Sequence, residues 1–240
     1  MPIDFKKTEK DLYQPKATPS IIDVPEMTFI TVSGKGNPNT SAEYKTALEI
    51  LYGLSYSIKM SKMSGTLPEG YFEYVIPPLE GLWWMPDGEA MDFSDKDSFR
   101  WTSLIRQPDF VTQEVFEDAK KALARKKSEL DTSKARLEVI IEGLCVQVMH
   151  IGSYDDEPAT IAKMEKYAVD SGYEIDIDVT RRHHEIYLSD PRKVAPEKLK
   201  TVIRHPTKVA ESEAKYNTQC IENDCASLNG RNEEHQTGQT

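Results

Sequence analysis

The chain has 240 residues, and its 40 Asp and Glu outnumber its 30 Lys and Arg, giving a formal net charge of −10. This charge argues against a general nucleic-acid-binding protein, which needs a basic surface. Hydrophobic residues make up 38% of the chain, which excludes wholesale disorder and suffices for one large domain or two small ones. Because the chain lacks both an apolar run of membrane-spanning length and an apolar secretion signal, we expect a cytoplasmic protein.

The N-terminal quarter is predicted to contain one strand and one helix. Residues 1–20 mix charges with prolines, and we expect a leader that wraps around the domain or frays. Residues 27–33 are rich in β-branched and aromatic side chains and run into a glycine-containing turn, which is typical of a strand. Thr40 and Glu43 form a capping box, and apolar residues then recur at helical spacing as far as Ile58.

The next segment is predicted to contain three strands and a long helix. The strands are expected over 71–76, 79–85 and 99–106, with a proline pair separating the first two. An acidic loop over 87–97 precedes the third strand. A helix over 112–130 follows, because one apolar stripe opposes a heavily charged face.

The second half repeats this order of elements. Glycine, proline and alternating apolar residues delimit each predicted element. In chain order we expect a strand over 144–151 and a helix that begins at Asp155 and is closed by Gly172. Strands over 174–179 and 183–188 follow, and then a strand over 200–205 that stops at Pro206. A disordered polar tail is expected over 209–240.

Three cysteines are present, and none suggests a metal centre. Cys145 lies in an apolar run and is expected to be a small buried residue, whereas Cys220 and Cys225 lie in the polar tail. A structural zinc site needs four ligands in closed geometry, and the sequence offers no such set. We therefore predict no metal.

Three anchors recur in the same order in the two halves of the chain. Val32 and Gly36 of the first half match Val148 and Gly152 of the second half. Residues 79–83 match 184–188, and residues 104–108 match 202–206. An internal repeat of this kind predicts two copies of one structural unit. We therefore predict an α+β fold of two strand-helix-strand-strand modules, over 27–108 and 142–206, in a pseudo-two-fold arrangement with antiparallel sheets and a ligand groove between them.

The alternation of side chains in the repeated strands predicts a site. Ile186 is expected to face the helix of its module, so that Glu185 and Tyr187 face away from it. The aligned strand of the first copy places Glu80 and Trp84 in the same way. If the two copies pack side by side, these helix-free faces line a shared groove with two carboxylates and aromatic walls, which is our candidate site.

Structural alternatives exist for the acidic and indole side chains. Either glutamate could form an ion pair with an arginine of a neighbouring strand, such as Arg106 or Arg204. Trp83 and Trp84 cannot both be buried in a regular strand, so one of them is expected to face a groove unless a bulge buries both.

Three further side chains near the predicted groove have alternative interpretations. His183 and His184 are adjacent in a strand, point to opposite faces and cannot share one metal ion without a bulge. They are expected to be solvated or locally hydrogen-bonded. Tyr154 precedes the second helix and is either a wall of the pocket or a packing residue of the turn.

Four segments resemble the GyrI-like small-molecule-binding family, and the resemblance covers residues 20–208. The segments are Pro77-Pro-Leu-Glu-Gly-Leu-Trp-Trp84, Arg106-Gln-Pro-Asp-Phe-Val111, His150-Ile-Gly-Ser-Tyr154 and His183-His-Glu-Ile-Tyr-Leu-Ser-Asp-Pro-Arg192. Members of the family are built from two strand-helix-strand-strand modules and bind ligands in the groove between them. The resemblance therefore implies the fold that the repeat predicts.

The resemblance implies several functions. Some members are ligand domains of multidrug-sensing transcription activators, in which a buried Glu at the position of Glu185 meets cationic aromatic drugs. Stand-alone members resemble cyclopropanoid cyclopropyl hydrolases, and another member inhibits DNA gyrase. We expect no room for a DNA-binding domain before residue 20, and the segment 77–84 is most similar to the stand-alone, hydrolase-type branch.

This branch implies a mechanism that needs no cofactor. Water would add to the cyclopropane ring of an aromatic genotoxin, with Glu185 as the base for water and Tyr187 holding the substrate or donating to the developing oxyanion. Trp84 and Trp101 would stack on the flat substrate, and Glu80 would share the role of Glu185. The predicted substrate-binding set is Glu80, Trp84, Trp101, Tyr154 and His183.

Two other functions remain open. A groove with carboxylates and aromatic walls could bind lipophilic aromatic cations without chemistry, as a sensor or sequestering protein. A gyrase-type protein partner has weaker support, since an acidic loop such as 87–97 is usually just solvated. We expect a small aromatic or cationic lipophilic ligand, no direct nucleic-acid or membrane binding, and either a monomer or a homodimer.

Overall fold

The computed structural model of the chain describes residues 1–64, 67–86 and 91–211. Its helices are α1 (Phe5–Thr8), α2 (Lys10–Tyr13), α3 (Ala42–Lys59), α4 (Gln113–Lys126) and α5 (Glu157–Asp170), with short 3-10 turns η1 (Ser61–Ser64), η3 (Lys96–Ser98), η4 (Tyr154–Asp156) and η5 (Pro196–Lys198). Its strands are β1 (Ser20–Val24), β2 (Met27–Lys35), β3 (Leu79–Trp84), β4 (Arg100–Arg106), β5 (Arg136–Ile140), β6 (Gly143–Ile151), β7 (Tyr173–Ile175), β8 (His183–Tyr187) and β9 (Lys200–Val209).

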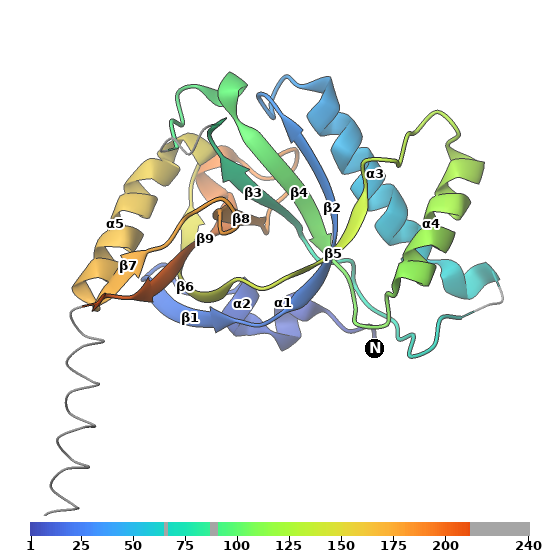
Figure 1. Cartoon of the computed structure of the whole chain (residues 1–240), viewed down its shortest axis with the longest axis horizontal. Coiled ribbons are helices and arrows are strands. Elements are labelled where there is room, and N and C mark those ends of the chain that lie inside the picture. The colour runs from blue at the N-terminus through green and yellow to red at the C-terminus, as the bar shows by residue number, and fades with distance from the viewer. Residues whose placement is uncertain (65–66, 87–90, 212–240) are drawn as a thin grey trace, which may run out of the picture.

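The strands form a curled antiparallel sheet in the order β1-β6-β9-β8-β3-β4-β2-β5, with β7 paired to the end of β9 (Figure 1). Strands β2, β4 and β3 belong to the first copy of the repeat, and β8, β9 and β6 belong to the second. The two copies meet where β3 pairs with β8 at the centre of the sheet. The predicted α+β fold of two strand-helix-strand-strand modules is therefore confirmed.

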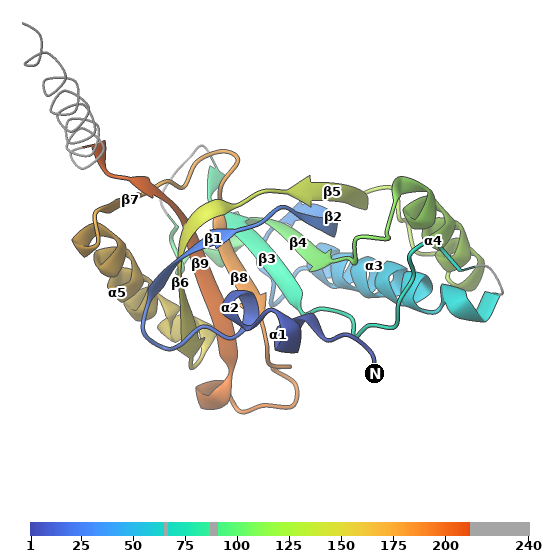
Figure 2. The ribbon, with the colours of Figure 1, turned by 90° about the horizontal axis from the view of Figure 1, so that it is seen from below.

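Helices cover both faces of this sheet. On the face that we call the helix face, α3 packs on β2 and β4, α4 packs on α3, and α5 packs on β6 and β9. On the opposite face, the N-terminal face, α1 and α2 cross the centre of the sheet (Figure 2). Among the described residues no helix is both long and apolar enough to cross a membrane.

The long helices begin where the sequence provides a cap. The Ser41 hydroxyl accepts a hydrogen bond from the Tyr44 amide at the start of α3, one residue after the predicted cap at Thr40. The Thr112 hydroxyl caps α4 by accepting a hydrogen bond from the Val115 amide, at the start of the predicted helix. Capping side chains satisfy amides that have no partner within the helix, which is why these residues delimit the helices.

The N-terminal leader is ordered and well packed. The aromatic side chains of Phe5 and Tyr13 and the aliphatic side chain of Leu12 are buried on the N-terminal face of the sheet, in one cluster with Ile186. The leader thus wraps around the domain, as one of the two expected outcomes. Its local sequence is charged, and the apolar partners of its few hydrophobic residues lie far along the chain.

Several strand predictions need correction. Residues 71–76 form only an isolated bridge, at Tyr74, and the predicted strand 174–179 reduces to β7. Strands β1 and β5 were not predicted. Strand β9 does not stop at Pro206, because Pro206 faces Cys145 of β6 and the strand continues to Val209.

Other predictions fall on residues outside the described part of the chain. Residues 212–240, which contain Cys220, Cys225 and nearly all of the predicted disordered tail, are among them. Residues 87–90 of the predicted acidic loop are outside it as well.

The strand pairing corrects the alignment of the two copies by one residue. The predicted alignment made Glu80 equivalent to Glu185, but in the sheet Glu80 lies opposite Ile186, and Gly81 lies opposite Glu185. Residues directly opposite each other in neighbouring strands share a face of the sheet. A shift of one residue therefore moves Glu80 to the face opposite Glu185.

Candidate functional site

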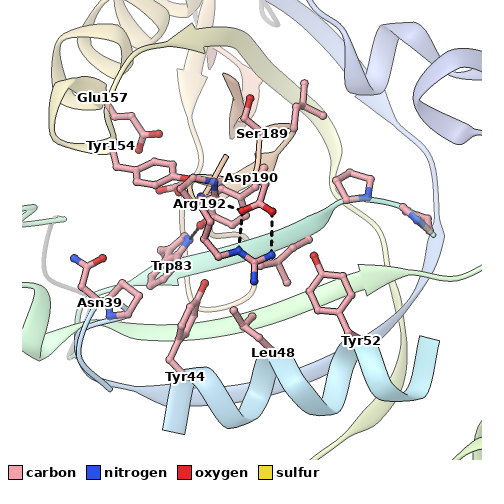
Figure 3. Close-up of a pocket in the computed structure, with 18 of the residues that line it drawn as sticks. Asn39, Tyr44, Leu48, Tyr52, Trp83, Tyr154, Glu157, Ser189, Asp190 and Arg192 are labelled. Carbon is pink, nitrogen blue, oxygen red and sulfur yellow. Dashed lines mark hydrogen bonds and ion pairs between the residues drawn. The ribbon is translucent and has the colours of Figure 1, made fainter. Parts of the chain in front are cut away.

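A cavity of about 700 Å³ opens on the helix face where the two copies meet. It is bounded by α3, β3 and β8, the start of α5, and the loop that follows β8. In Figure 3, Tyr44, Leu48 and Tyr52 project from α3 towards the cavity, and Tyr154 and Glu157 approach from the other side. The cavity is thus built by both copies of the repeat.

Among the described residues, eight aromatic side chains line the cavity. They are Tyr44, Tyr52, Tyr56, Trp83, Phe93, Phe99, Tyr154 and Tyr187. The Trp83 indole Nε1 donates a hydrogen bond of 3.0 Å to the Tyr187 hydroxyl, and the ring of Tyr154 meets Tyr187 edge-on at 5.9 Å. A wall of this kind binds flat apolar molecules by burial and by ring contacts.

Gly81 makes the contact between Trp83 and Tyr187 possible. A Cβ atom at Gly81 would lie 2.5 Å from Trp83 Nε1 and 3.0 Å from the Tyr187 hydroxyl oxygen. Glycine is therefore needed where β3 passes under the aromatic wall, because a side chain there would displace both groups.

Two buried carboxyl groups, Glu157 at the start of α5 and Glu185 on β8, lie together in the cavity wall. Carboxyl oxygens of both residues and a ring nitrogen of His183 all lie within 4.8 Å of one another. The Glu185 carboxylate is 2.9 Å from His183 Nε2 and also accepts a hydrogen bond from Tyr187. The site therefore holds a carboxyl pair that is anchored on one side by an imidazole and a phenol.

The pKa values of the two carboxyl groups are displaced in opposite directions. Burial, the negative charge of Glu185 and a hydrogen bond to it raise the pKa of Glu157 to about 10. Burial alone would raise the pKa of Glu185, but the hydrogen bond and charge of His183, together with hydrogen bonds from Tyr187 and Glu157, lower it below its usual value. At neutral pH the pair therefore shares one proton, with Glu157 protonated and Glu185 ionised.

Glu157, His183 and Glu185 also have the spacing of a three-ligand metal site. In the described structure both ring nitrogens of His183 already face hydrogen-bond partners, Nε2 towards Glu185 and Nδ1 towards His205 at 2.6 Å. In this structure the three side chains therefore form a hydrogen-bonded cluster.

The mouth of the cavity is charged. Arg192 makes two hydrogen bonds of 2.9 Å to the two carboxylate oxygens of Asp190, in the loop after β8 (Figure 3). The Arg192 side chain is 86% exposed, whereas that of Asp190 is 26% exposed. A pair exposed to this degree contributes little to stability, and it can rearrange when a ligand enters.

The structure brings only part of the predicted site together. Glu185, Tyr187 and Tyr154 line the cavity. His183 is 1% exposed and lies behind Glu185, where it holds the carboxylate. The prediction that Glu185 and Tyr187 face away from the helices is wrong, because they share the helix face with Trp83, which lies opposite His183.

The other three predicted residues lie away from the cavity. Trp101 is fully buried under Gly34 and meets the ring of Tyr44 edge-on at 5.0 Å, so no face of its indole is free for a ligand. Trp84 lies on the N-terminal face, where the guanidinium of Arg182 stacks on it at 4.7 Å.

Glu80 belongs to a buried polar network on the N-terminal face. Its carboxylate is 3.0 Å from His184 Nε2, while His184 Nδ1 faces Glu142 at 2.9 Å, and Glu142 pairs with Arg204 at 2.8 Å. Neither arginine proposed as a partner of Glu80 contacts it directly, because Arg106 pairs with Glu9. Glu80 thus has a structural partner and lies outside the cavity.

This network has displaced pKa values. Burial opposes the charge on His184, but the carboxylates of Glu142 and Glu80 outweigh it and raise the pKa of His184 to about 9. Burial opposes the charge on Glu142 as well, yet His184 and Arg204 lower its pKa to about 2. The network is therefore charged at neutral pH and joins the two copies beneath the leader.

Most residues that line the cavity were not predicted from the sequence, among them Tyr44, Trp83 and Glu157. Trp83 was one of two adjacent indoles, and only the strand register decides which of them faces the cavity. Glu157 follows two aspartates at a helix start, where acidic residues are common because they complement the helix dipole. Nothing local distinguishes it from its neighbours.

The comparisons with known proteins agree with this geometry. Residues 17–208 match the model of the GyrI-like small molecule binding domain. An uncharacterized conserved protein from Listeria innocua is 50% identical, with a TM-score of 0.82, and the match covers 86% of this chain and all of that one. A hydrolase from Listeria innocua is 48% identical, with a TM-score of 0.81, and the match covers 87% of this chain and all of that one. A comparison with curated proteins found no match.

Proposed function

The chain belongs to the GyrI-like small-molecule-binding family, and on this premise we propose that it is a hydrolase that adds water to the cyclopropane ring of electrophilic aromatic genotoxins. The observation that carries the proposal is the carboxyl pair of Glu157 and Glu185 in the wall of an aromatic cavity. The similarity to proteins from Listeria innocua that are named hydrolases supports the reaction class.

The proposed reaction begins with a flat substrate between the aromatic walls. Its cyclopropane is fused to a dienone, so the ring methylene is electrophilic. The Glu185 carboxylate removes a proton from a water molecule as the water oxygen bonds to that methylene carbon. The ring carbon–carbon bond breaks, and its electron pair flows through the dienone to the carbonyl oxygen, which becomes a phenolate. Protonation by solvent completes a phenol carrying a hydroxymethyl group.

The neighbours of Glu185 are suited to a base in this step. Tyr187 and His183 hold the carboxylate in place and keep it ionised, so that it acts without prior loss of a proton. Protonated Glu157 is a hydrogen-bond donor at the same point and adds no second negative charge. The tyrosine hydroxyls of the wall could donate to the phenolate oxygen, because burial keeps the pKa of Tyr154 at about 12.

The test uses a cyclopropane-bearing alkylating natural product in oxygen-18 water. Wild-type protein is expected to release a ring-opened product with one labelled oxygen, and Glu185→Gln to lower the rate by about 10²–10⁴-fold, the usual contribution of a general base. Asp118→Asn, an exposed change of the same kind on α4, is the control. The proposal fails if wild type leaves the compound unchanged, or if Glu185→Gln turns it over at the wild-type rate.

One observation favours a second candidate, a sequestering protein for lipophilic aromatic cations. The cavity combines aromatic faces with the carboxylates of Glu185 and Asp190, a combination that attracts cations by charge and cation–π contact. This candidate predicts that intact compound is retained in stoichiometric amount, without labelled product. It also predicts that Glu185→Gln weakens binding of cationic dyes more than that of neutral dyes of the same shape.

A further inference from the structure

A row of hydrogen-bonded side chains leads away from Glu185 on the side remote from the cavity. His183 Nε2 is 2.9 Å from the Glu185 carboxylate, and His183 Nδ1 is 2.6 Å from His205 Nε2. His205 Nδ1 is 2.9 Å from the carboxylate of Glu165 on α5. The row therefore passes from β8 to β9 and on to α5, without a gap.

Burial decreases along this row from the centre outwards. The side chains of His183 and His205 are 1% and 4% exposed, whereas that of Glu165 is 39% exposed. Glu165 therefore meets solvent beneath α5, on a route that does not pass through the cavity mouth. The row thus links a buried carboxylate in the cavity wall with a partly exposed carboxylate on α5.

The chemistry of the groups sets the direction of each hydrogen bond. An ionised Glu165 can only accept, so Nδ1 of His205 carries a hydrogen and, in the neutral ring, Nε2 accepts. Burial lowers the pKa of His205, which favours this neutral form. Nδ1 of His183 must then donate to His205. Nε2 of His183 donates to the ionised Glu185, so each of the three hydrogen bonds in the row contains one proton.

We infer that Glu165, His205 and His183 form a relay of hydrogen bonds through which the Glu165 carboxylate holds His183 as a donor to Glu185 and so keeps the base ionised. This inference rests on the proposed function and assigns three positioning residues to it. With a proton in each of the three hydrogen bonds, His183 carries hydrogens on both ring nitrogens, and the Glu165 carboxylate stabilises this positive charge through His205. The relay therefore positions and ionises Glu185 without taking part in the transfer of the water proton.

The charged groups that face the relay lie on helix α5 and strand β8, the two elements next to the β9 strand that carries His205. Glu165 and Glu157 are on α5, and Glu185 is on β8 next to His183. The nearest other ring is that of Phe93, which meets His183 edge-on and carries no charge. Removing the Glu165 charge should therefore act on His205 and His183 directly.

The first test does not need turnover. In full-length protein labelled with ¹⁵N-histidine, we expect the ring signals of His205 at neutral pH to show a hydrogen on Nδ1 and an acceptor at Nε2. Glu165→Gln keeps an acceptor but removes the charge. It should lower the pKa of His205 further, because the hydrogen bond and the charge of Glu165 raise that pKa. Asp170→Asn, which removes an exposed carboxylate of α5 paired with Lys166, should leave the pKa of His205 unchanged.

The second test measures kcat/KM against pH for the same variants. Without the Glu165 charge, the positive charge on His183 is less stable. His183 then lowers the pKa of Glu185 by a smaller amount. The acid limb should therefore move to higher pH in Glu165→Gln and in His205→Gln, with KM and the melting temperature changed little in Glu165→Gln. An unchanged acid limb in both variants, or an unchanged pKa of His205 in Glu165→Gln, overturns the relay.

The two tests separate the relay from the proposed function. A lowered pKa of His205 in Glu165→Gln, in a protein that turns over no cyclopropane substrate, overturns the proposed hydrolase and supports the relay. Turnover by wild type with no effect of Glu165→Gln on the pKa of His205 overturns the relay and supports the hydrolase.

Discussion

At the scale of single residues, the environment gives two carboxyl groups different chemistry. Glu157 and Glu185 have the same side chain, yet one is held protonated and the other ionised, because His183 and Tyr187 contact only the second. Two like charges at this distance in a buried wall cannot both persist. The pair therefore titrates as a unit, with apparent pKa values far apart.

This separation predicts a bell-shaped pH profile and different effects of the two amide variants. kcat/KM should fall as the pH drops through the low pKa of Glu185, and fall again above about 10, where Glu157 loses its proton. Glu157→Gln mimics the protonated acid, so it should keep activity within about tenfold of wild type and lose the alkaline limb. Rate measurements from pH 4 to 11 check this. An alkaline limb at about pH 10 in Glu157→Gln would assign it to another group.

At the scale of elements, strand β3 can pass close beneath the aromatic wall because it has a glycine, Gly81, at that point. Gly81 lets Trp83 and Tyr187 approach each other, and Gly34 does the same for the buried ring of Trp101, 2.4 Å from where a Cβ would lie. The two glycines make similar close approaches, one at the cavity and the other in the core of the first copy.

The two alanine variants should therefore differ in what they damage. Gly81→Ala should displace the aromatic wall and reduce kcat/KM by about tenfold or more, at a stability cost of about 1–3 kcal/mol for overpacking. Gly34→Ala should have a comparable stability cost, with a smaller loss of activity in the folded protein. Urea unfolding and rates at matched folded concentration compare them. Equal loss of activity in both variants would contradict this assignment.

At the scale of the whole molecule, the leader and both copies are joined by the buried network of His184. Glu80 comes from β3, Glu142 from the turn before β6, and Arg204, whose guanidinium donates to the Leu12 carbonyl, from β9. The pKa of His184 in the folded protein, about 9, lies above its ordinary value of 6.5. This histidine therefore contributes stability that is fully present below pH 6.5 and is lost as the pH rises through 9.

The linkage predicts a fall in the free energy of unfolding between pH 6.5 and 9, with an upper bound on the order of 3 kcal/mol. His184→Gln should be less stable than wild type, because it leaves buried carboxylates without their partner, and it should lose this pH dependence. Urea unfolding at several pH values measures both effects. His150→Gln, another buried histidine bonded to Thr160 and Ser153, should retain the dependence. A wild-type slope in His184→Gln would contradict the linkage.

The sequence by itself determined most of the elements and their order. Caps, turns and helical spacing predicted α3, α4 and α5, and alternation predicted the central strands, because these signals act over a few residues. The internal repeat predicted two modules, since each copy carries the same local signals. The pairing of Glu185 with Tyr187 on one face followed from alternation alone and is confirmed by the register.

Only the tertiary structure decided which face of β8 carries the site. Alternation separates the two faces of a strand but does not say what covers each, and Ile186 packs on Phe5, Leu12 and Tyr13 of a leader whose own sequence shows no packing pattern. A one-residue error in the alignment of the two copies was enough to place Glu80 wrongly beside Glu185. Glu157 was missed for another reason, because its position in the cavity depends on how α5 docks on the sheet. Contacts between segments this far apart in the chain are set by the packing of the whole molecule, and no local pattern encodes them.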